Sequence, residues 1–260
     1  MAGGFTMPRN IVMSPFSYVA FELCMKLMEN GQEVVGIEPS PSSLDEGERE
    51  EKELFVGRNA NWILQSVEEF SLSSSEESIL YVCDIDSYGP SIQDFLEEKR
   101  GGACKLVYIS TPDDLPLTNI TGWPKPDVWV HLPSVYGSWQ PKGSFFERSL
   151  LGRTFPFEEY EKEDRQDILY IDDAVDAILE LAEWKIGAYQ VRSGVENHWY
   201  EVLKEAGYSI IYDTNEVQGR NHTESEQIHY ANTRIKPGQG IEMLRRHMKN
   251  VMRERGLFPR

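Results

Sequence analysis

Short apolar runs alternate along this chain with segments of helical periodicity. The most continuous run, Ile79–Cys83, is typical of a strand covered on both faces of a parallel sheet. The strands are predicted at Asn10–Met13, Glu33–Ile37, Leu54–Val56, Ile79–Cys83, Lys105–Ile109, Asp127–His131, Ala188–Val191 and Ser209–Tyr212. The helices are predicted at Tyr18–Met28, Trp62–Phe70, Ser91–Arg100, Phe145–Leu151, Asp172–Trp184 (capped by Asp172 or Asp173), His198–Ala206 and Ile241–Arg255. This order predicts an α/β fold with a doubly wound parallel sheet.

The alternation breaks in the linker Thr111–Pro126, which joins the fifth and sixth strands. Its four prolines and one glycine exclude a helix of any length. Neighbouring parallel strands normally need a helical crossover to cover the sheet face. The linker could supply that cover through Leu115, Leu117, Ile120 and Trp123. Otherwise we expect a protein partner, or a second copy of the chain, to occupy the uncovered face.

Composition narrows the classes of partner. The formal net charge is -17, from 43 acidic and 26 basic residues. Such a field repels phosphate backbones and anionic lipid, so we expect neither nucleic-acid nor membrane partners. No apolar run reaches the length of a membrane span. The three cysteines lie in apolar patterns without metal-binding spacing, so we expect free thiols, no metal site and a cytoplasmic location.

Five segments carry a resemblance, in order and at consistent spacing: Asn10–Ala20, Lys105–Ser110, Val130–Gly137, Asp167–Ile178 and Ala188–Gly194. They resemble the extended short-chain dehydrogenase/reductases, the NAD-dependent epimerases and dehydratases of nucleotide-sugars. The resemblance implies a Rossmann-like sheet with a small C-terminal α+β lobe. It implies a dinucleotide-type domain over residues 1–140, a return to that core over 141–186, and a substrate-type lobe over 187–260.

The chain departs from the family where the family holds its cofactor. A glycine-rich turn lets bare backbone approach a pyrophosphate at a helix N-terminus. The family's glycine positions correspond here to Ser14, Ser17 and Ala20, and Pro15 lacks an N–H group. The acidic residue that holds a ribose corresponds to Glu38, and the aspartate that contacts adenine corresponds to Arg58.

The catalytic positions depart as well. The family's Tyr-x-x-x-Lys pair lies on the helix that the proline-rich linker replaces, and the linker contains no tyrosine. The family's catalytic serine corresponds to Ser110. The segment that resembles the family's later strand keeps Tyr136 but has His131 where the family has an arginine. A second arginine of the family corresponds to Gln166, and Arg165 is its neighbour.

We therefore predict a catalytically degenerate protein without a cofactor, acting as a structural, regulatory or partner-binding module. One alternative is an atypical nucleotide-sugar epimerase, dehydratase or reductase that uses NAD or NADP, with Tyr136 or Tyr170 as a displaced base. A second alternative is a nucleotide or metabolite sensor. The crevice of such a sensor would be lined by Ser14, Ser17, Glu38, Ser110 and Tyr136.

Overall fold

The computed structural model describes residues 8–39, 45–72, 77–84, 88, 90–100, 104–112, 122–151, 167–207 and 226–254. The strands are β1 (Arg9–Met13), β2 (Val34–Glu38), β3 (Trp62–Ser66), β4 (Ser78–Val82), β5 (Cys104–Ser110), β6 (Val128–His131), β7 (Ser134–Tyr136), β8 (Ile168–Tyr170), β9 (Gly187–Arg192) and β10 (Gln227–Tyr230). The helices are α1 (Tyr18–Glu29), α2 (Glu46–Val56), α3 (Pro90–Arg100), α4 (Phe145–Leu150), α5 (Ile171–Trp184), α6 (His198–Glu205) and α7 (Pro237–Glu254).

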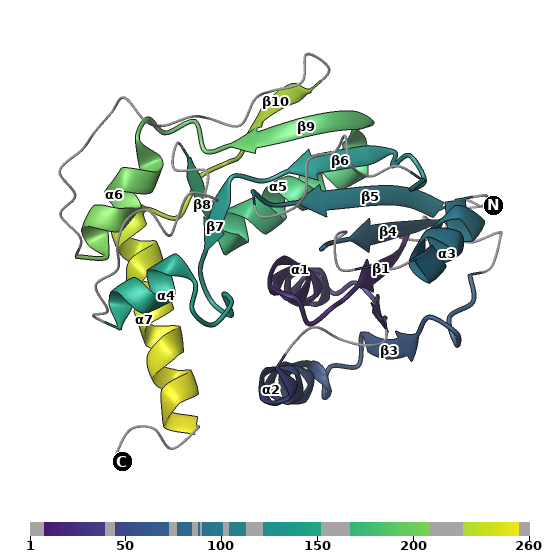
Figure 1. Cartoon of the computed structure of the whole chain (residues 1–260), viewed down its shortest axis with the longest axis horizontal. Helices are drawn as coiled ribbons and strands as arrows, with labels where there is room; N and C mark the ends of the chain where they lie inside the picture. The colour runs from purple at the N-terminus through teal and green to yellow at the C-terminus, as the bar shows by residue number, and fades with distance from the viewer. Residues whose placement is uncertain are drawn as a thin grey trace, which may run out of the picture. The chain divides into compact units, whose positions relative to one another are not determined.

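The main sheet has eight strands in the order β10-β9-β6-β5-β4-β1-β2-β3 (Figure 1). In its centre β1 pairs in parallel with β2 and β4, so that Met13 lies beside Ile37 on one side and Val82 on the other. Because these strands run in the same direction, their carboxyl ends share one edge of the sheet. The arrangement is Rossmann-like and confirms the predicted α/β fold class.

The chain divides into two compact units. Unit 1 contains residues 1–110, 114–130 and 178–188, and unit 2 contains residues 111–113, 131–177 and 189–260. The three segments that the resemblance implied stay a prediction.

The core of unit 1 fills one face of β1, β2, β4 and β5 beneath α3. It consists of buried apolar side chains: Ile11, Met13, Val35, Ile37, Phe70, Leu80, Val82, Ile92, Phe95, Leu96, Cys104, Leu106 and Tyr108. On the opposite face Val12 and Val107 are fully buried, and α1 packs against β1 and β2. The central strand β4 is therefore buried along its whole length, as its continuous apolar run predicted.

The assignment of α2 and β3 from sequence was wrong. The chain forms α2 over residues that include the predicted strand 54–56, and it forms β3 within the predicted helix 62–70. Asp45 begins α2 by accepting the Glu48 N–H at 3.1 Å, and acidic residues of the first turn favour this end of the helix. The apolar triplet that suggested a strand is the end of α2, where Leu54 and Phe55 are exposed.

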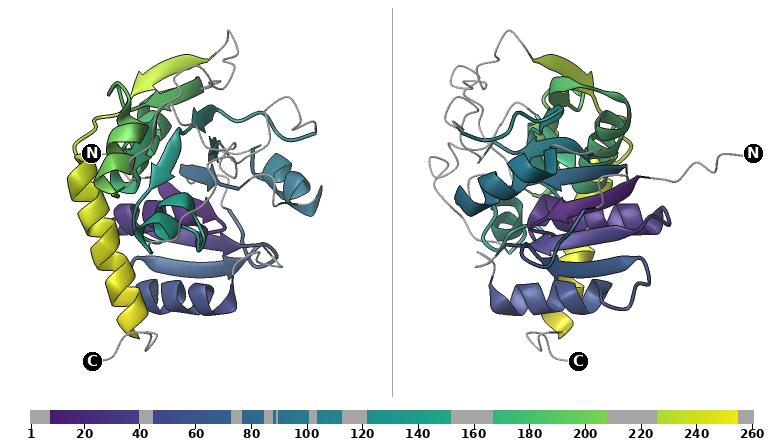
Figure 2. Two further views of the ribbon diagram at one scale, coloured as in Figure 1. Left: turned by 60° about the vertical axis from the view of Figure 1, so that its left-hand side comes forward. Right: turned by 90° about the vertical axis from the view of Figure 1, so that its right-hand side faces the viewer.

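The sequence analysis also missed the short strands of unit 2. β7 and β8 form a separate parallel pair, in which Tyr136 lies beside Tyr170. β10 pairs in parallel with β9, and its side chains are mostly exposed, so no apolar alternation marks it. α6 lies beside the first turns of α7 (Figure 2), where Arg245 donates to the Glu205 carbonyl at 3.3 Å. The predicted strand 209–212 lies outside the described residues.

Part of the proline-rich linker does pack on the sheet. Trp123 is half-buried, and its ring contacts Tyr108 of β5 with centroids 6.5 Å apart. Leu115, Leu117 and Ile120, the other side chains predicted to cover this face, lie outside the described residues. A protein partner at this face stays a prediction.

A buried lysine ties α2 to the turn after β1. The Lys52 side chain is fully buried, its Nζ donates to the Phe16 carbonyl at 2.8 Å, and it lies 3.0 Å from Glu48 Oε1. Burial lowers the pKa of Lys52, whereas the neighbouring Glu48 opposes that shift. The cation is therefore held in the interior by two specific oxygen atoms.

We expect Lys52→Met to lower the free energy of unfolding by about 3 kcal/mol, because it removes the buried amine that pairs with Glu48 and donates to the Phe16 carbonyl. Urea denaturation of the full-length chain measures the loss of unfolding free energy. The control is Lys204→Met, which removes an amine that is 70% exposed and should change little. Equal stability of the two variants would contradict a structural contribution of Lys52.

Candidate functional site

Three of the predicted site residues lie at the carboxyl edge of the sheet in unit 1. Ser14 directly follows β1, Glu38 ends β2 and Ser110 ends β5. Ser110 is buried, and Ser14 and Glu38 are half-buried. Ligands of open α/β sheets bind in the crevice at this edge. The structure therefore gathers these residues on the predicted edge.

The turn between β1 and α1 keeps a glycine-like backbone without a glycine. Ser14 has a φ of 49°, in the left-handed region that non-glycine residues rarely adopt. Its N–H donates to the Ile37 carbonyl at 2.9 Å, and its own carbonyl accepts the Ser17 N–H at 2.9 Å. The turn thus has a fixed conformation, anchored to β2 on one side and closed on itself on the other.

The bulky side chains of the turn pack against β2 and β3. Pro15 and Phe16 are buried, and Phe16 contacts Trp62 of β3 with ring centroids 6.1 Å apart. Gly36 of β2 makes room for them, since a Cβ there would collide with Trp62 and approach the Pro15 ring at 2.8 Å. Ser17 precedes α1 as its N-cap residue, and its buried hydroxyl oxygen makes no hydrogen bond to the described residues.

Tyr88 belongs to this site, although no motif in the sequence indicated it. Its hydroxyl donates to Ser14 Oγ at 2.9 Å. Burial raises the pKa of Tyr88 well above the ordinary value, and the nearby carboxylates of Asp84 and Glu38 raise it further. The phenol therefore stays protonated, and the end of β1, the end of β2 and the segment after β4 meet around it.

The other predicted residues do not join this group. Ala20 is buried inside α1. Arg58 lies exposed in the turn between α2 and β3, so its predicted position at the end of the third strand was wrong. The cause is the misassigned third strand, which really ends at Ser66. Arg165 lies outside the described residues.

His131 and Tyr136 lie in unit 2. His131 is buried at the end of β6, with Nε2 4.0 Å from Glu226 Oε1. Tyr136 is fully buried, and a Cβ at Gly240 of α7 would collide with its hydroxyl. Burial raises the pKa of Tyr136, which is the opposite of what a catalytic base needs. The Tyr136 ring packs against Phe146 and Tyr170.

One Tyr-x-x-x-Lys spacing does occur in the chain, and the sequence analysis overlooked it. Tyr200 and Lys204 lie four residues apart on α6, in unit 2. The Lys204 amine is 70% exposed and lies 3.9 Å from Glu201 Oε2, while Tyr200 packs against Trp199. A solvated lysine beside a carboxylate stabilises a phenolate poorly, so this pair lacks the environment of a proton-transfer pair.

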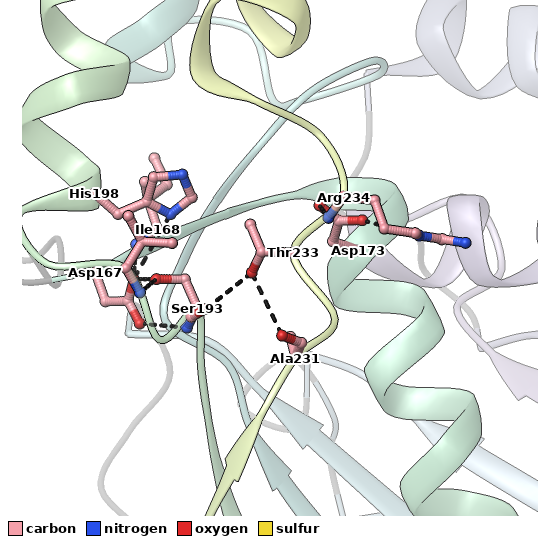
Figure 3. Close-up of polar contacts among 9 residues, drawn as sticks. Asp167, Ile168, Asp173, Ser193, His198, Ala231, Thr233 and Arg234 are labelled. Atoms are coloured by element: carbon pink, nitrogen blue, oxygen red, sulfur yellow. Dashed lines mark hydrogen bonds and ion pairs between the residues drawn. The ribbon is translucent and has the colours of Figure 1, made fainter.

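Unit 2 has its own buried polar network, centred on Asp167 (Figure 3). Asp167 precedes β8, and its carboxylate accepts from the Ser193 N–H at 2.7 Å and from Ser193 Oγ at 2.5 Å. The ring of His198, at the start of α6, is buried with Nδ1 3.9 Å from Asp167 Oδ1. The Ser193 carbonyl in turn accepts from Thr233 Oγ1 at 3.0 Å.

Asp173 performs a similar function six residues later. It was predicted to cap α5, but the helix begins at Ile171 and Asp173 lies within its first turn. Its buried carboxylate accepts from the backbone N–H groups of Arg234 and Ile235, at 3.1 and 3.0 Å (Figure 3). The Arg234 side chain also pairs with Asp176. Asp173 therefore fixes the segment that leads into α7.

The fold has many solved counterparts. UDP-glucuronic acid 4-epimerase from Bacillus cereus, in complex with NAD, matches 94% of this chain and 98% of its own with a TM-score of 0.63 at 16% identity. dTDP-glucose 4,6-dehydratase from Bacillus anthracis, also with NAD, matches 94% of this chain and 97% of its own with a TM-score of 0.60 at 12% identity. ADP-L-glycero-D-manno-heptose-6-epimerase from Helicobacter pylori matches 93% and 96%, with a TM-score of 0.55 at 15% identity.

No protein-family model and no curated protein sequence matches the chain. The resemblance to the extended short-chain dehydrogenase/reductases is confirmed at the level of the fold. The prediction that the chain has no cofactor is contradicted by its structural neighbours, two of which were solved with NAD. That prediction inferred the loss of the cofactor from the loss of glycine alone, whereas the turn is still formed here, with Ser14 in the left-handed conformation.

The residues at the carboxyl edge of the sheet in unit 1 are of types that could hold a dinucleotide. Ser14 and Ser17 would lie under the pyrophosphate at the start of α1, and the Glu38 carboxylate, at the end of β2, would accept from a ribose hydroxyl. The described residues contain no group of histidine, cysteine or carboxylate side chains arranged to hold a metal ion. None of the helices in the described ranges has the length and apolar character needed to cross a membrane.

We expect Asp173→Ala to lower the free energy of unfolding by about 3 kcal/mol, because two backbone N–H groups lose their buried acceptor. Chemical denaturation measures the change. Asp176→Ala, which removes a more exposed partner of Arg234, is the matched control and should cost less. A larger loss in the control would contradict the assignment to Asp173.

His198 should make the protein sensitive to mild acid. Burial lowers its folded-state pKa below the ordinary 6.5, so the unfolded chain binds the proton first. The free energy of unfolding should therefore fall as the pH drops from about 6.5 through the folded-state pKa. Denaturation at a series of pH values should show a shallower fall for His198→Gln than for the natural chain. Parallel curves would show that His198 does not cause the effect.

Proposed function

We propose that this chain binds an NAD-type dinucleotide at the carboxyl edge of unit 1 and works as a binding or regulatory module rather than as an epimerase. The observation that carries the proposal is the left-handed conformation of Ser14 at the turn between β1 and α1. A non-glycine residue is held there only when surrounding contacts enforce it, and such strain is concentrated at functional sites.

The proposal of a non-enzymatic function rests on proton transfer. NAD supplies a hydride acceptor when bound, but oxidation of a sugar hydroxyl also needs a base for its proton. The linker between β5 and β6 contains no tyrosine. Burial raises the pKa of Tyr136, and the lysine of the Tyr200–Lys204 pair is exposed. None of these residues offers a phenolate next to a buried cation.

We expect saturable quenching of tryptophan fluorescence when the protein is titrated with NADH, with energy transfer from its six tryptophans to the dihydronicotinamide. Ser14→Gly should retain the affinity, because glycine adopts a positive φ without strain. Ser14→Val should weaken it at least tenfold, because a β-branched residue is disfavoured there.

The same protein, incubated with NAD and UDP-glucuronic acid, should form neither NADH nor an epimerised sugar. Absence of saturable binding in the natural chain would contradict the binding half of the proposal. Turnover would contradict the non-enzymatic half.

A further inference from the structure

The turn at the proposed dinucleotide site has few backbone donors to offer. Pro15 has no N–H group, the Ser14 N–H donates to the Ile37 carbonyl, and the Ser17 N–H donates to the Ser14 carbonyl. A glycine-rich turn binds a pyrophosphate largely through such groups. Apart from the N–H groups in the first turn of α1, a dinucleotide held here therefore needs hydrogen-bond donors from outside the turn.

Tyr88 brings a side-chain donor to the turn. Its hydroxyl lies 2.9 Å from Ser14 Oγ, although the two residues are 74 positions apart in the sequence. Ser14 Oγ is a weak, neutral acceptor, and a phosphate oxygen in its place would be a stronger, charge-assisted one. The Tyr88 hydroxyl could therefore donate to a phosphate oxygen in place of Ser14 Oγ.

The Tyr88 ring is held in place by its neighbours. It contacts the Trp123 ring with centroids 6.3 Å apart, and Trp123 packs in turn against Tyr108 of β5. Tyr88 also packs against the core of unit 1. The ring is thus positioned before any ligand arrives, which limits the conformational entropy lost on binding.

Protonation favours the same assignment. Burial raises the pKa of Tyr88 above its ordinary value, so the phenol remains a donor throughout the physiological range. A neutral hydroxyl also adds no repulsion toward a phosphate, whereas the Glu38 and Asp84 carboxylates nearby do.

We propose that the Tyr88 hydroxyl donates to the pyrophosphate of the dinucleotide and replaces the glycine amides that the turn lacks. This inference rests on the proposed function and names a binding residue for it. In the free protein Ser14 Oγ holds the hydroxyl in position, and in the complex the phosphate accepts its hydrogen bond.

The test is Tyr88→Phe, which removes one oxygen atom and keeps the ring contact with Trp123. NADH and ADP-ribose should bind roughly tenfold more weakly to this variant, because one hydrogen bond to a charged group is lost. Adenosine, which lacks the pyrophosphate, should bind the variant and the natural chain alike. Tyr230→Phe removes a hydroxyl from a side chain that is 65% exposed and is the matched control. The midpoint of thermal unfolding verifies that each variant is folded.

The outcomes separate the two proposals. If the natural chain binds NADH and Tyr88→Phe binds it equally well, the assignment of Tyr88 fails and the proposed function stands. Tighter binding by Tyr88→Phe would show that the hydroxyl obstructs the site, which also overturns the assignment. If adenosine binding weakens as much as NADH binding, Tyr88 acts on the adenosine half, and the pyrophosphate assignment is wrong. If the natural chain does not bind NADH, the proposed function fails and this inference fails with it.

Discussion

The structure of unit 1 depends on how a turn without glycine is held in a glycine's conformation. A non-glycine residue in the left-handed region costs roughly 1–2 kcal/mol. Here the Ser14 N–H bonds to the Ile37 carbonyl, Ser14 Oγ accepts from Tyr88, and the Phe16 carbonyl accepts from Lys52. Each contact comes from a different element, so β2, α2 and the segment after β4 jointly offset that cost. The turn is therefore a point where the elements of unit 1 are joined.

Two buried carboxylates have the corresponding function in unit 2. Asp167 holds the end of β9 through Ser193, and Asp173 holds the segment that leads into α7 through the N–H groups of Arg234 and Ile235. Both carboxylates come from the stretch that most resembles the epimerases and dehydratases. In this chain each carboxylate accepts hydrogen bonds from backbone N–H groups of a distant segment, which gives both aspartates a structural function.

The sequence predicted elements well where burial on both faces produces a continuous apolar run, as in β4, and less well where charge decides. α2 was missed because its buried face contains Glu48 and Lys52 while Leu54 and Phe55 are exposed, the reverse of the usual pattern. That error moved the third strand and with it the predicted position of Arg58. Hydrophobic periodicity predicts which apolar residues are buried. It does not predict the burial of a lysine that pairs with a carboxylate, as Lys52 does with Glu48.

The site shows the same limit in another form. Motif comparison identified Ser14, Ser17 and Glu38 by position, since the carboxyl ends of parallel strands must share one edge. It could not identify Tyr88, because a contact across 74 positions is set by the path of the chain between them. Nor could it show that Ser14 adopts a backbone angle that favours glycine. A lost motif residue and a lost conformation are different events.

The electrostatic surroundings decide which kind of donor suits this turn. The chain has a net charge of -17, and the carboxylates of Glu38 and Asp84 both act on Tyr88. Lys52, the cation beneath the turn, already donates to the Phe16 carbonyl and lies beside Glu48, so much of its charge is compensated locally. A dinucleotide therefore gains little from long-range attraction at this edge. At the proposed site, short and directional hydrogen bonds from side-chain donors would therefore supply most of the affinity for a dinucleotide.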